Sequence, residues 1–207
     1  LVFVSSVKAQ AERAEVPLTE HDPPMPEDVY GATKLEAEGA LADALAGSRT
    51  TCTVIRPPLV YGPGVRANLR RLAEVALAGW PLPFARVDNR RSMIAVDNLA
   101  DLLARALAHP AAAGRTYLAA DGVDLSTPDL IRRIAQAGGR RARLFPVPPG
   151  WLAGGLRLAG RSGAADRLLG SLRLDTTRVR GELGWAPPVS VDAGLEAMVA
   201  ALRRERA

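Results

Sequence analysis

The distribution of apolar and polar residues along the chain predicts strands and helices in alternation. Short apolar runs rich in β-branched residues are typical of buried strands. Apolar residues recurring three and four positions apart are typical of helices with one buried face. The predicted strands lie at residues 1–4, at 51–55, within 90–98 and at 116–119. The predicted helices lie at residues 28–46, 68–78, 97–107, 126–137 and 191–204, with a glycine-broken helical stretch at 150–171.

Helix-capping residues, glycines and prolines indicate where these elements should begin and end. Gly47 and Gly79 follow two of the helices, where a glycine readily adopts the left-handed conformation that ends a helix. Asp97 and Ser126 are expected to be N-caps. The polar, proline-rich residues 9–28 predict a loop.

The order of the predicted elements indicates the fold class. Strands and helices alternate, and the connections between successive strands are too long for hairpins. Strands joined in this way pair in parallel and are covered by helices. The sequence therefore predicts an α/β fold.

Composition narrows the function classes. The net charge is +5, but the arginines are scattered among acidic residues and only 4% of residues are aromatic, so no basic, aromatic-rich platform for nucleic acid is expected. Cys52 is the only cysteine, which excludes an internal disulfide and a multi-cysteine metal site. No run of 18 apolar residues occurs, so no membrane partner is expected, and the single cysteine favours a reducing, cytoplasmic location.

The stretch PEDVYGATKLEAE, residues 26–38, contains the first candidate chemistry. Tyr30 and Lys34 are four residues apart, so they share one face of the predicted helix. Lys34 is one of only two lysines beside 25 arginines (27 basic residues minus 2). A free tyrosine is a poor base at neutral pH, and a nearby ammonium favours its phenolate form. The pair could transfer a proton to or from a hydroxyl group, or could be a coincidence on a surface helix.

Ser5 and Ser6 follow the first predicted strand directly. In open α/β sheets, ligands bind outside the carboxyl ends of the strands. Ser6 is therefore a candidate for contact with a substrate, although a serine in this place can also serve only to bond the end of the strand.

Several segments together resemble a known family. They are VFVSS, YGATKLEAE, VIRPPLVYGPG, NRRSMIAVDNLADLL and LGWAPPVSVDAGL, in this order. The chain resembles the extended short-chain dehydrogenase/reductase family, and within it the NAD-dependent nucleotide-sugar epimerase/dehydratase branch. The resemblance covers essentially the whole chain.

The resemblance implies roles for individual residues. Ser6 would hydrogen-bond the reacting sugar oxygen, Tyr30 would act as acid and base, and Lys34 would hold the nicotinamide ribose. Pro57 would lie close to the nicotinamide of NAD, and NADP is not excluded as the cofactor. The reaction would be hydride transfer at a sugar carbon, usually C4, in an epimerase or a 4-ketoreductase, with surface polysaccharide synthesis as the expected setting.

The resemblance also implies a substrate and a partner. The substrate would be a UDP-linked nucleotide sugar, whose diphosphate Asn68 and Arg91 would hold. Leu82–Phe84 would lie along the base. A homodimer through the helix that carries Tyr30 is a family expectation, although the apolar positions of that helix could equally pack within one subunit.

The family's cofactor fingerprint is a glycine-rich turn after the first strand. No G-x-x-G-x-x-G pattern occurs in the 207 residues. The expectation is therefore an N-terminally truncated chain that retains the C-terminal part of a doubly wound parallel (Rossmann-type) sheet and a smaller α/β substrate lobe. Residues 1–62 and 91–122 would belong to the dinucleotide-binding domain, and residues 63–90 and 123–207 to the substrate lobe.

Two alternatives stay open at this point. One is an oxidoreductase of the same fold that acts on a steroid, flavonoid or other small hydroxyl compound, since RPPLVYGPG also suits such enzymes. The other is an inactive fragment that lacks half of the NAD site. Asn68 and Arg91 favour the nucleotide-sugar interpretation, because a diphosphate needs such groups and a steroid does not.

Overall fold

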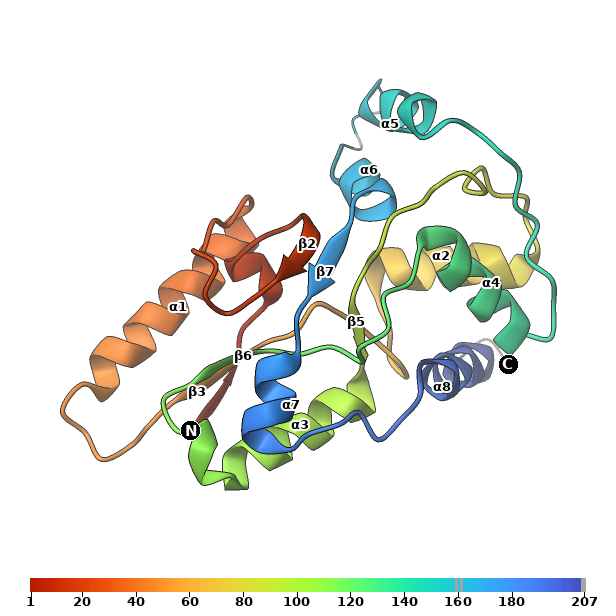
Figure 1. The fold of residues 1–207 in the computed structure, drawn as a ribbon. Coiled ribbons are helices and arrows are strands. Elements are labelled where there is room, and N and C mark those ends of the chain that lie inside the picture. Colours follow the sequence, from red (N-terminus) through yellow and green to blue (C-terminus); the bar gives the residue numbers. More distant parts are fainter. Residues whose placement is uncertain (159, 161, 206–207) are drawn as a thin grey trace. The chain divides into compact units, whose positions relative to one another are not determined.

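The computed structural model describes residues 1–158, 160 and 162–205, and it divides the chain into two compact units (Figure 1). Unit 1 consists of Leu1–Val60, Ser92–Val123 and Leu172–Val189. Unit 2 consists of Tyr61–Arg91, Asp124–Ser171 and the segment from Ser190 onward. Both units are therefore built from segments that are distant in sequence.

A parallel sheet forms the centre of unit 1. Its strands β1 (Val2–Val4), β3 (Thr53–Arg56) and β6 (Thr116–Leu118) stand in the order β1-β3-β6, and both pairings are parallel. Successive residues of a strand face opposite sides of the sheet. Tyr117 accordingly packs in one core cluster with Ile55, and Leu118 packs in another with Val7. The predicted α/β class with parallel strands is confirmed.

A second parallel pair joins β2 (Ala14–Leu18) to β7 (Leu172–Leu174), which lie side by side in Figure 1. The prediction of a loop over residues 9–28 was therefore wrong for β2, because pairing with a distant strand compensates for its polar, proline-containing sequence. The same pairing places Leu172–Val189 in unit 1, whereas the sequence grouped it with the smaller lobe. The short strands β4 (Leu59–Tyr61) and β5 (Met93–Ala95) pair with each other.

Helices and 3₁₀ turns complete unit 1. They are the 3₁₀ turn η1 (Val7–Ala9), α1 (Val29–Leu45), α3 (Val96–Ala108), the 3₁₀ turn η2 (Pro110–Ala112) and α7 (Thr177–Leu183). The expected cap at Asp97 was wrong, because α3 begins one residue earlier and Asp97 lies in its first turn. There the carboxylate still favours the helix through the dipole of the first turn. In α1, only Gly31 is buried.

Unit 2 is predominantly helical. Its helices are α2 (Ala67–Ala78), α4 (Thr127–Ala137), α5 (Pro149–Leu158), α6 (Ser162–Leu169) and α8 (Val191–Arg204). Helix α4 packs against both α2 and α8, and α5 packs against α6. Ser126 caps α4 as predicted, with its side chain accepting from the N–H of Asp129. In the described part of the chain, every helix is too short or too polar to span a bilayer.

Candidate functional site

The carboxyl ends of β1 and β3 bring Ser6 and Pro57 together. The N–H of Ser5 donates to the carbonyl oxygen of Ile55 at 2.8 Å, and the N–H of Val7 donates to that of Pro57 at 2.9 Å. Ser6 therefore lies between two hydrogen bonds that join its segment to the Pro57 segment. Its buried hydroxyl oxygen accepts from the N–H of Lys8 at 3.2 Å, so its O–H can still donate to a ligand.

Lys34 joins the same strand end from helix α1. Its ammonium donates to the carbonyl oxygen of Val4 at 3.1 Å, and it lies 5.2 Å from the centre of the Phe3 ring. The same ammonium is 5.9 Å from the centre of the Tyr30 ring, within the range of a cation–π contact. Tyr30 itself is 52% exposed, so its phenol is accessible to a ligand.

Gly31 allows α1 to approach this strand end closely. A Cβ atom at position 31 would collide with the backbone carbonyl of Lys8 in η1, so only glycine fits there. The first turn of α1 thus lies directly on the segment that follows Ser6. The glycine beside Tyr30 sets the distance between the helix and the strand end.

An ion pair fastens the same contact. The ammonium of Lys8 bonds Asp28 and Glu12, and Asp28 also caps α1 by accepting from the N–H of Gly31 at 2.7 Å. Burial disfavours the ammonium, but the bonds to Asp28 and Glu12 outweigh it and raise the pKa of Lys8. Burial likewise disfavours the Asp28 carboxylate, yet the bonds from Lys8 and Gly31 lower the pKa of Asp28. Both groups are therefore charged at neutral pH.

In unit 2, Asn68 lines a cavity of about 400 Å³. Leu82, which the resemblance associates with a nucleotide base, lines the same cavity. Arg71 and Arg167 also line it and supply positive charge beside the Asn68 amide. Sequence reasoning missed both arginines, because nothing in a chain with 25 of them distinguishes these two.

Arg91 does not line this cavity among the described residues. Its backbone N–H and carbonyl bond Leu125, and its guanidinium donates to the carbonyl oxygen of Gly170 at 3.0 Å. It is half-buried within unit 2. The structure therefore places Asn68 and Arg91 in the same unit, but in different contacts.

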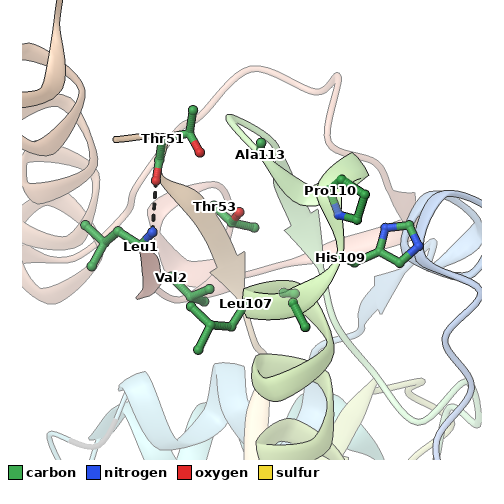
Figure 2. Close-up of a pocket in the computed structure, with 10 residues that line it drawn as sticks. Leu1, Val2, Thr51, Thr53, Leu107, His109, Pro110 and Ala113 are labelled. Atoms are coloured by element: carbon green, nitrogen blue, oxygen red, sulfur yellow. Dashed lines mark hydrogen bonds between the residues drawn. The ribbon is translucent and has the colours of Figure 1, made fainter. Parts of the chain in front are cut away.

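Another pocket lies in unit 1, at the ends of β1 and β3 that are opposite to Ser6 and Pro57. It measures about 160 Å³ and is lined by Leu1, Val2, Thr51, Leu107 and His109 among others (Figure 2). The terminal ammonium of Leu1 donates to the carbonyl oxygen of Thr51 at 3.0 Å at its edge. This pocket is at the amino ends of β1 and β3, where parallel sheets rarely bind ligands.

The candidate site residues thus fall into two groups, one in unit 1 and the other, Asn68 and Arg91, in unit 2. Ser6, Lys34 and Pro57 converge at the carboxyl ends of two parallel strands, and Tyr30 lies one helical turn before Lys34. This group offers a phenol, an ammonium and a hydroxyl, the set required to move a proton at a bound alcohol. Among the described residues, no group of three or more metal-ligating side chains occurs.

Comparison with known proteins identifies related sequences. The family model described as "NAD dependent epimerase/dehydratase family" matches residues 1–120. The chain is 37% identical over 198 residues to a UDP-glucose 4-epimerase of Vibrio cholerae, a match that covers 94% of this chain and 60% of the relative. It is 25% identical over 210 residues to an N-acetyl-alpha-D-glucosaminyl-diphospho-ditrans,octacis-undecaprenol 4-epimerase of Escherichia coli O157:H7. This match covers 95% of this chain and 63% of the relative.

The fold is similar to that of a UDP-glucuronic acid 4-epimerase of Bacillus cereus solved in complex with NAD. The TM-score is 0.77 at 18% identity, and the alignment covers all of this chain and 62% of the solved one. The chain thus spans about 60% of the length of the curated relatives it matches.

Proposed function

The chain belongs to the NAD dependent epimerase/dehydratase family, and we propose that it supplies the proton-transfer site and the substrate cavity of a nucleotide-sugar 4-epimerase. The observation that supports this most directly is the convergence of Ser6, Lys34 and Pro57, with Tyr30 on the same helix face as Lys34. The named relatives, all 4-epimerases, support the sugar C4 as the reacting carbon.

Tyr30 performs the proton transfer in this proposal. Its phenolate accepts the proton of the sugar hydroxyl, and its phenol later returns one to the sugar oxygen. The Ser6 hydroxyl donates to the same sugar oxygen and orients it. The ammonium of Lys34 lies 5.9 Å from the centre of the Tyr30 ring, and its bond to the Val4 carbonyl keeps it at the strand end.

The residues present fit part of an NAD site. Lys34 and Tyr30 would contact the nicotinamide ribose, and the buried Pro57 would border the nicotinamide ring, because these groups lie at the carboxyl ends of β1 and β3. When bound, NAD takes up and returns a hydride. The glycine-rich turn that would hold the pyrophosphate is not in the 207 residues.

The cavity around Asn68 is the proposed place of the nucleotide diphosphate. Arg71 and Arg167 add donors that suit phosphate oxygens, and Leu82 gives an apolar surface for a base. Arg91 is proposed as a further diphosphate contact, since the residue is only half-buried. The relative that acts on an undecaprenol-linked sugar supports a role in the synthesis of surface polysaccharide.

The proposal is tested by incubating the protein with UDP-glucose and NAD⁺ and measuring the formation of UDP-galactose by NMR. Conversion that depends on added NAD⁺ is expected. In parallel, calorimetric titration with NAD⁺ measures cofactor binding without turnover. Binding without conversion of UDP-glucose, UDP-glucuronate or their N-acetylated relatives would contradict the epimerase and point to a different substrate.

A 4-ketoreductase would use the same residues without inversion at C4. The two reactions differ in cofactor stoichiometry, because an epimerase regenerates its cofactor in each cycle and a reductase consumes one reduced cofactor per product. Net oxidation of NADPH or NADH with a 4-keto sugar, and no conversion of UDP-glucose, would identify the reductase. The same assay with NADP⁺ in place of NAD⁺ determines which cofactor is used.

A further inference from the structure

A buried ion pair lies beside the proposed proton-transfer site, and the proposed proton transfer does not use it. Arg56, the last residue of β3, and Glu38 of α1 bond through two parallel contacts, from Nε at 3.0 Å and from a terminal nitrogen at 2.6 Å. Their side chains are only 7% and 10% exposed. The third described bond of the guanidinium goes to Gln10 Oε1 at 2.9 Å.

The network reaches every segment that bears a residue of the proposed proton-transfer site. Ser5, next to Ser6, donates its hydroxyl to Glu38 at 2.5 Å. Arg56 immediately precedes Pro57, and Glu38 follows Lys34 by four residues, as Lys34 follows Tyr30. Residues four apart lie on one helix face, so α1 presents Tyr30, Lys34 and Glu38 in a row.

Gln10 extends the network into the segment before α1. Its side-chain amide donates to the carbonyl oxygens of Thr19 at 2.6 Å and Asp22 at 2.8 Å. Gln10 is 1% exposed, and its backbone carbonyl accepts from the N–H of Met25 at 2.8 Å. The segment leading into Tyr30 is thereby tied to Arg56.

Stability alone is a poor reason for such a pair. Removing two charges from water is costly, and well-packed apolar residues in the same volume are often equally or more stabilising. A guanidinium fork against a carboxylate, however, fixes both distance and orientation, which apolar packing does not. The charged pair is therefore suited to define geometry.

We propose that Glu38 and Arg56 are positioning residues for the proton-transfer site: their fork holds the end of β1, the end of β3 and helix α1 in one arrangement, so that Ser6, Lys34 and Pro57 face the same bound alcohol. Neither residue touches the substrate. This inference rests on the proposed function for its effect on catalysis, and on the described contacts for its effect on geometry.

The test replaces the pair by apolar residues of similar size, Glu38→Leu together with Arg56→Met, in the intact protein. Melting temperature establishes folding, and turnover of UDP-glucose establishes function. We expect a folded protein whose kcat falls on the order of 100-fold, with KM little changed, because a misplaced acid–base group affects the transition state rather than ground-state binding. Arg56→Lys, which keeps the charge but loses the fork, should fold and lose part of kcat.

A second measurement does not depend on activity. Hydrogen exchange of the Ser5 and Val7 amides, which bond Ile55 and Pro57, should accelerate by at least about tenfold in the double variant, since local opening is no longer opposed by the fork. The Val54 amide, which bonds the carbonyl oxygen of Arg115 at 2.8 Å, is the internal reference and should be unchanged.

The exposed pair Arg13–Glu27, 54% and 44% exposed, is the matched control. Arg13→Gln with Glu27→Gln should change neither kcat nor exchange at Ser5. A folded double variant of Glu38 and Arg56 with unchanged exchange or unchanged kcat overturns the inference. Faster exchange together with a parent protein that never converts a nucleotide sugar would instead refute the proposed function and leave the geometric role supported.

Discussion

The two ends of the unit 1 sheet differ in chemistry although the same strands form both. At the carboxyl ends, Ser6 and Pro57 are bordered by Lys34 and by a buried ion pair. At the amino ends, a pocket of about 160 Å³ is lined mainly by small and apolar residues (Figure 2). The convergent polar groups lie at the end opposite that pocket, so the proposed proton-transfer site and the pocket do not coincide.

Helix α1 explains part of the difference. It meets the carboxyl end through Gly31, Lys34 and Glu38, each in contact with a different part of that end. Because side chains of a helix recur every turn, one helix delivers a row of polar groups to one edge. The amino ends are bordered instead by the last turn of α3, which contributes Leu107, and by η2, which contributes Pro110. His109 lies between these two elements and also lines the pocket.

The largest effect is expected for Tyr30→Phe. Loss of the phenol hydroxyl removes the proposed acid and base, so turnover of UDP-glucose should fall by about 10²- to 10⁴-fold. The control is Tyr117→Phe, which removes the same atom from a tyrosine of β6. Burial and a bond to Glu182 raise the pKa of Tyr117, so it remains a neutral donor in the core. An equal loss of turnover in both variants would show that the Tyr30 hydroxyl has no special role in the reaction.

Arg91→Leu extends the comparison to unit 2. If Arg91 holds the diphosphate, KM for UDP-glucose should rise about tenfold in this variant, because one charged hydrogen bond to the substrate is lost. Arg90→Leu is the matched control, because Arg90 is half exposed and pairs with Asp88 and Asp129 on the surface. An unchanged KM in the Arg91 variant would remove the diphosphate role from this residue.

Thr53→Val tests the amino end of the sheet. The buried Thr53 hydroxyl donates to the carbonyl oxygen of Ala112 at 2.6 Å, and Thr53 also lines the pocket of Figure 2. Its removal should lower the free energy of unfolding by about 0.5–1.5 kcal/mol, measured by urea denaturation, because a buried hydrogen bond is lost. The Ala112 carbonyl oxygen still accepts from the N–H of Arg115 at 3.1 Å. Turnover per folded molecule should not change. A selective loss of kcat would mean that the amino end takes part in function.

The smallest effect is expected for Asp28→Asn, through pH. The folded-state pKa of Asp28 is lowered, so its contribution to stability is present above its unfolded pKa of about 4 and is lost as pH falls through the folded value. Asparagine caps a helix as well as aspartate does, so only the charge is removed. Because Asp28 is partly exposed, the change should stay below about 1 kcal/mol at neutral pH.

The measurement is the dependence of urea denaturation midpoints on pH between pH 6 and 2. The decline of stability with acid should be shallower in the Asp28 variant than in the parent. Asp175→Asn is a comparison, because the pKa of Asp175 is lowered by bonds from Thr177, away from α1. Identical slopes for parent and Asp28→Asn would show that the Lys8–Asp28 contact does not stabilise the fold.

Local patterns were sufficient for much of this molecule. The α1 helix runs from Val29 to Leu45 with Asp28 as its cap, close to the predicted 28–46, because periodicity and capping depend on residues within one or two turns. The shared face of Tyr30 and Lys34 follows from helix geometry alone. The parallel α/β class likewise follows from the order and spacing of elements.

The tertiary structure decided what depends on partners distant in sequence. Strand β2 exists because it pairs with β7, a partner that no local pattern in a proline-containing segment reveals. Arg56 could not be distinguished from 24 other arginines until the fold placed Glu38 and Gln10 around it, and the cavity near Asn68 required α6 beside α2. Sequence alone thus determined the chemical groups and their local spacing, whereas burial and long-range pairing, which depend on the packed chain, decided which groups act together.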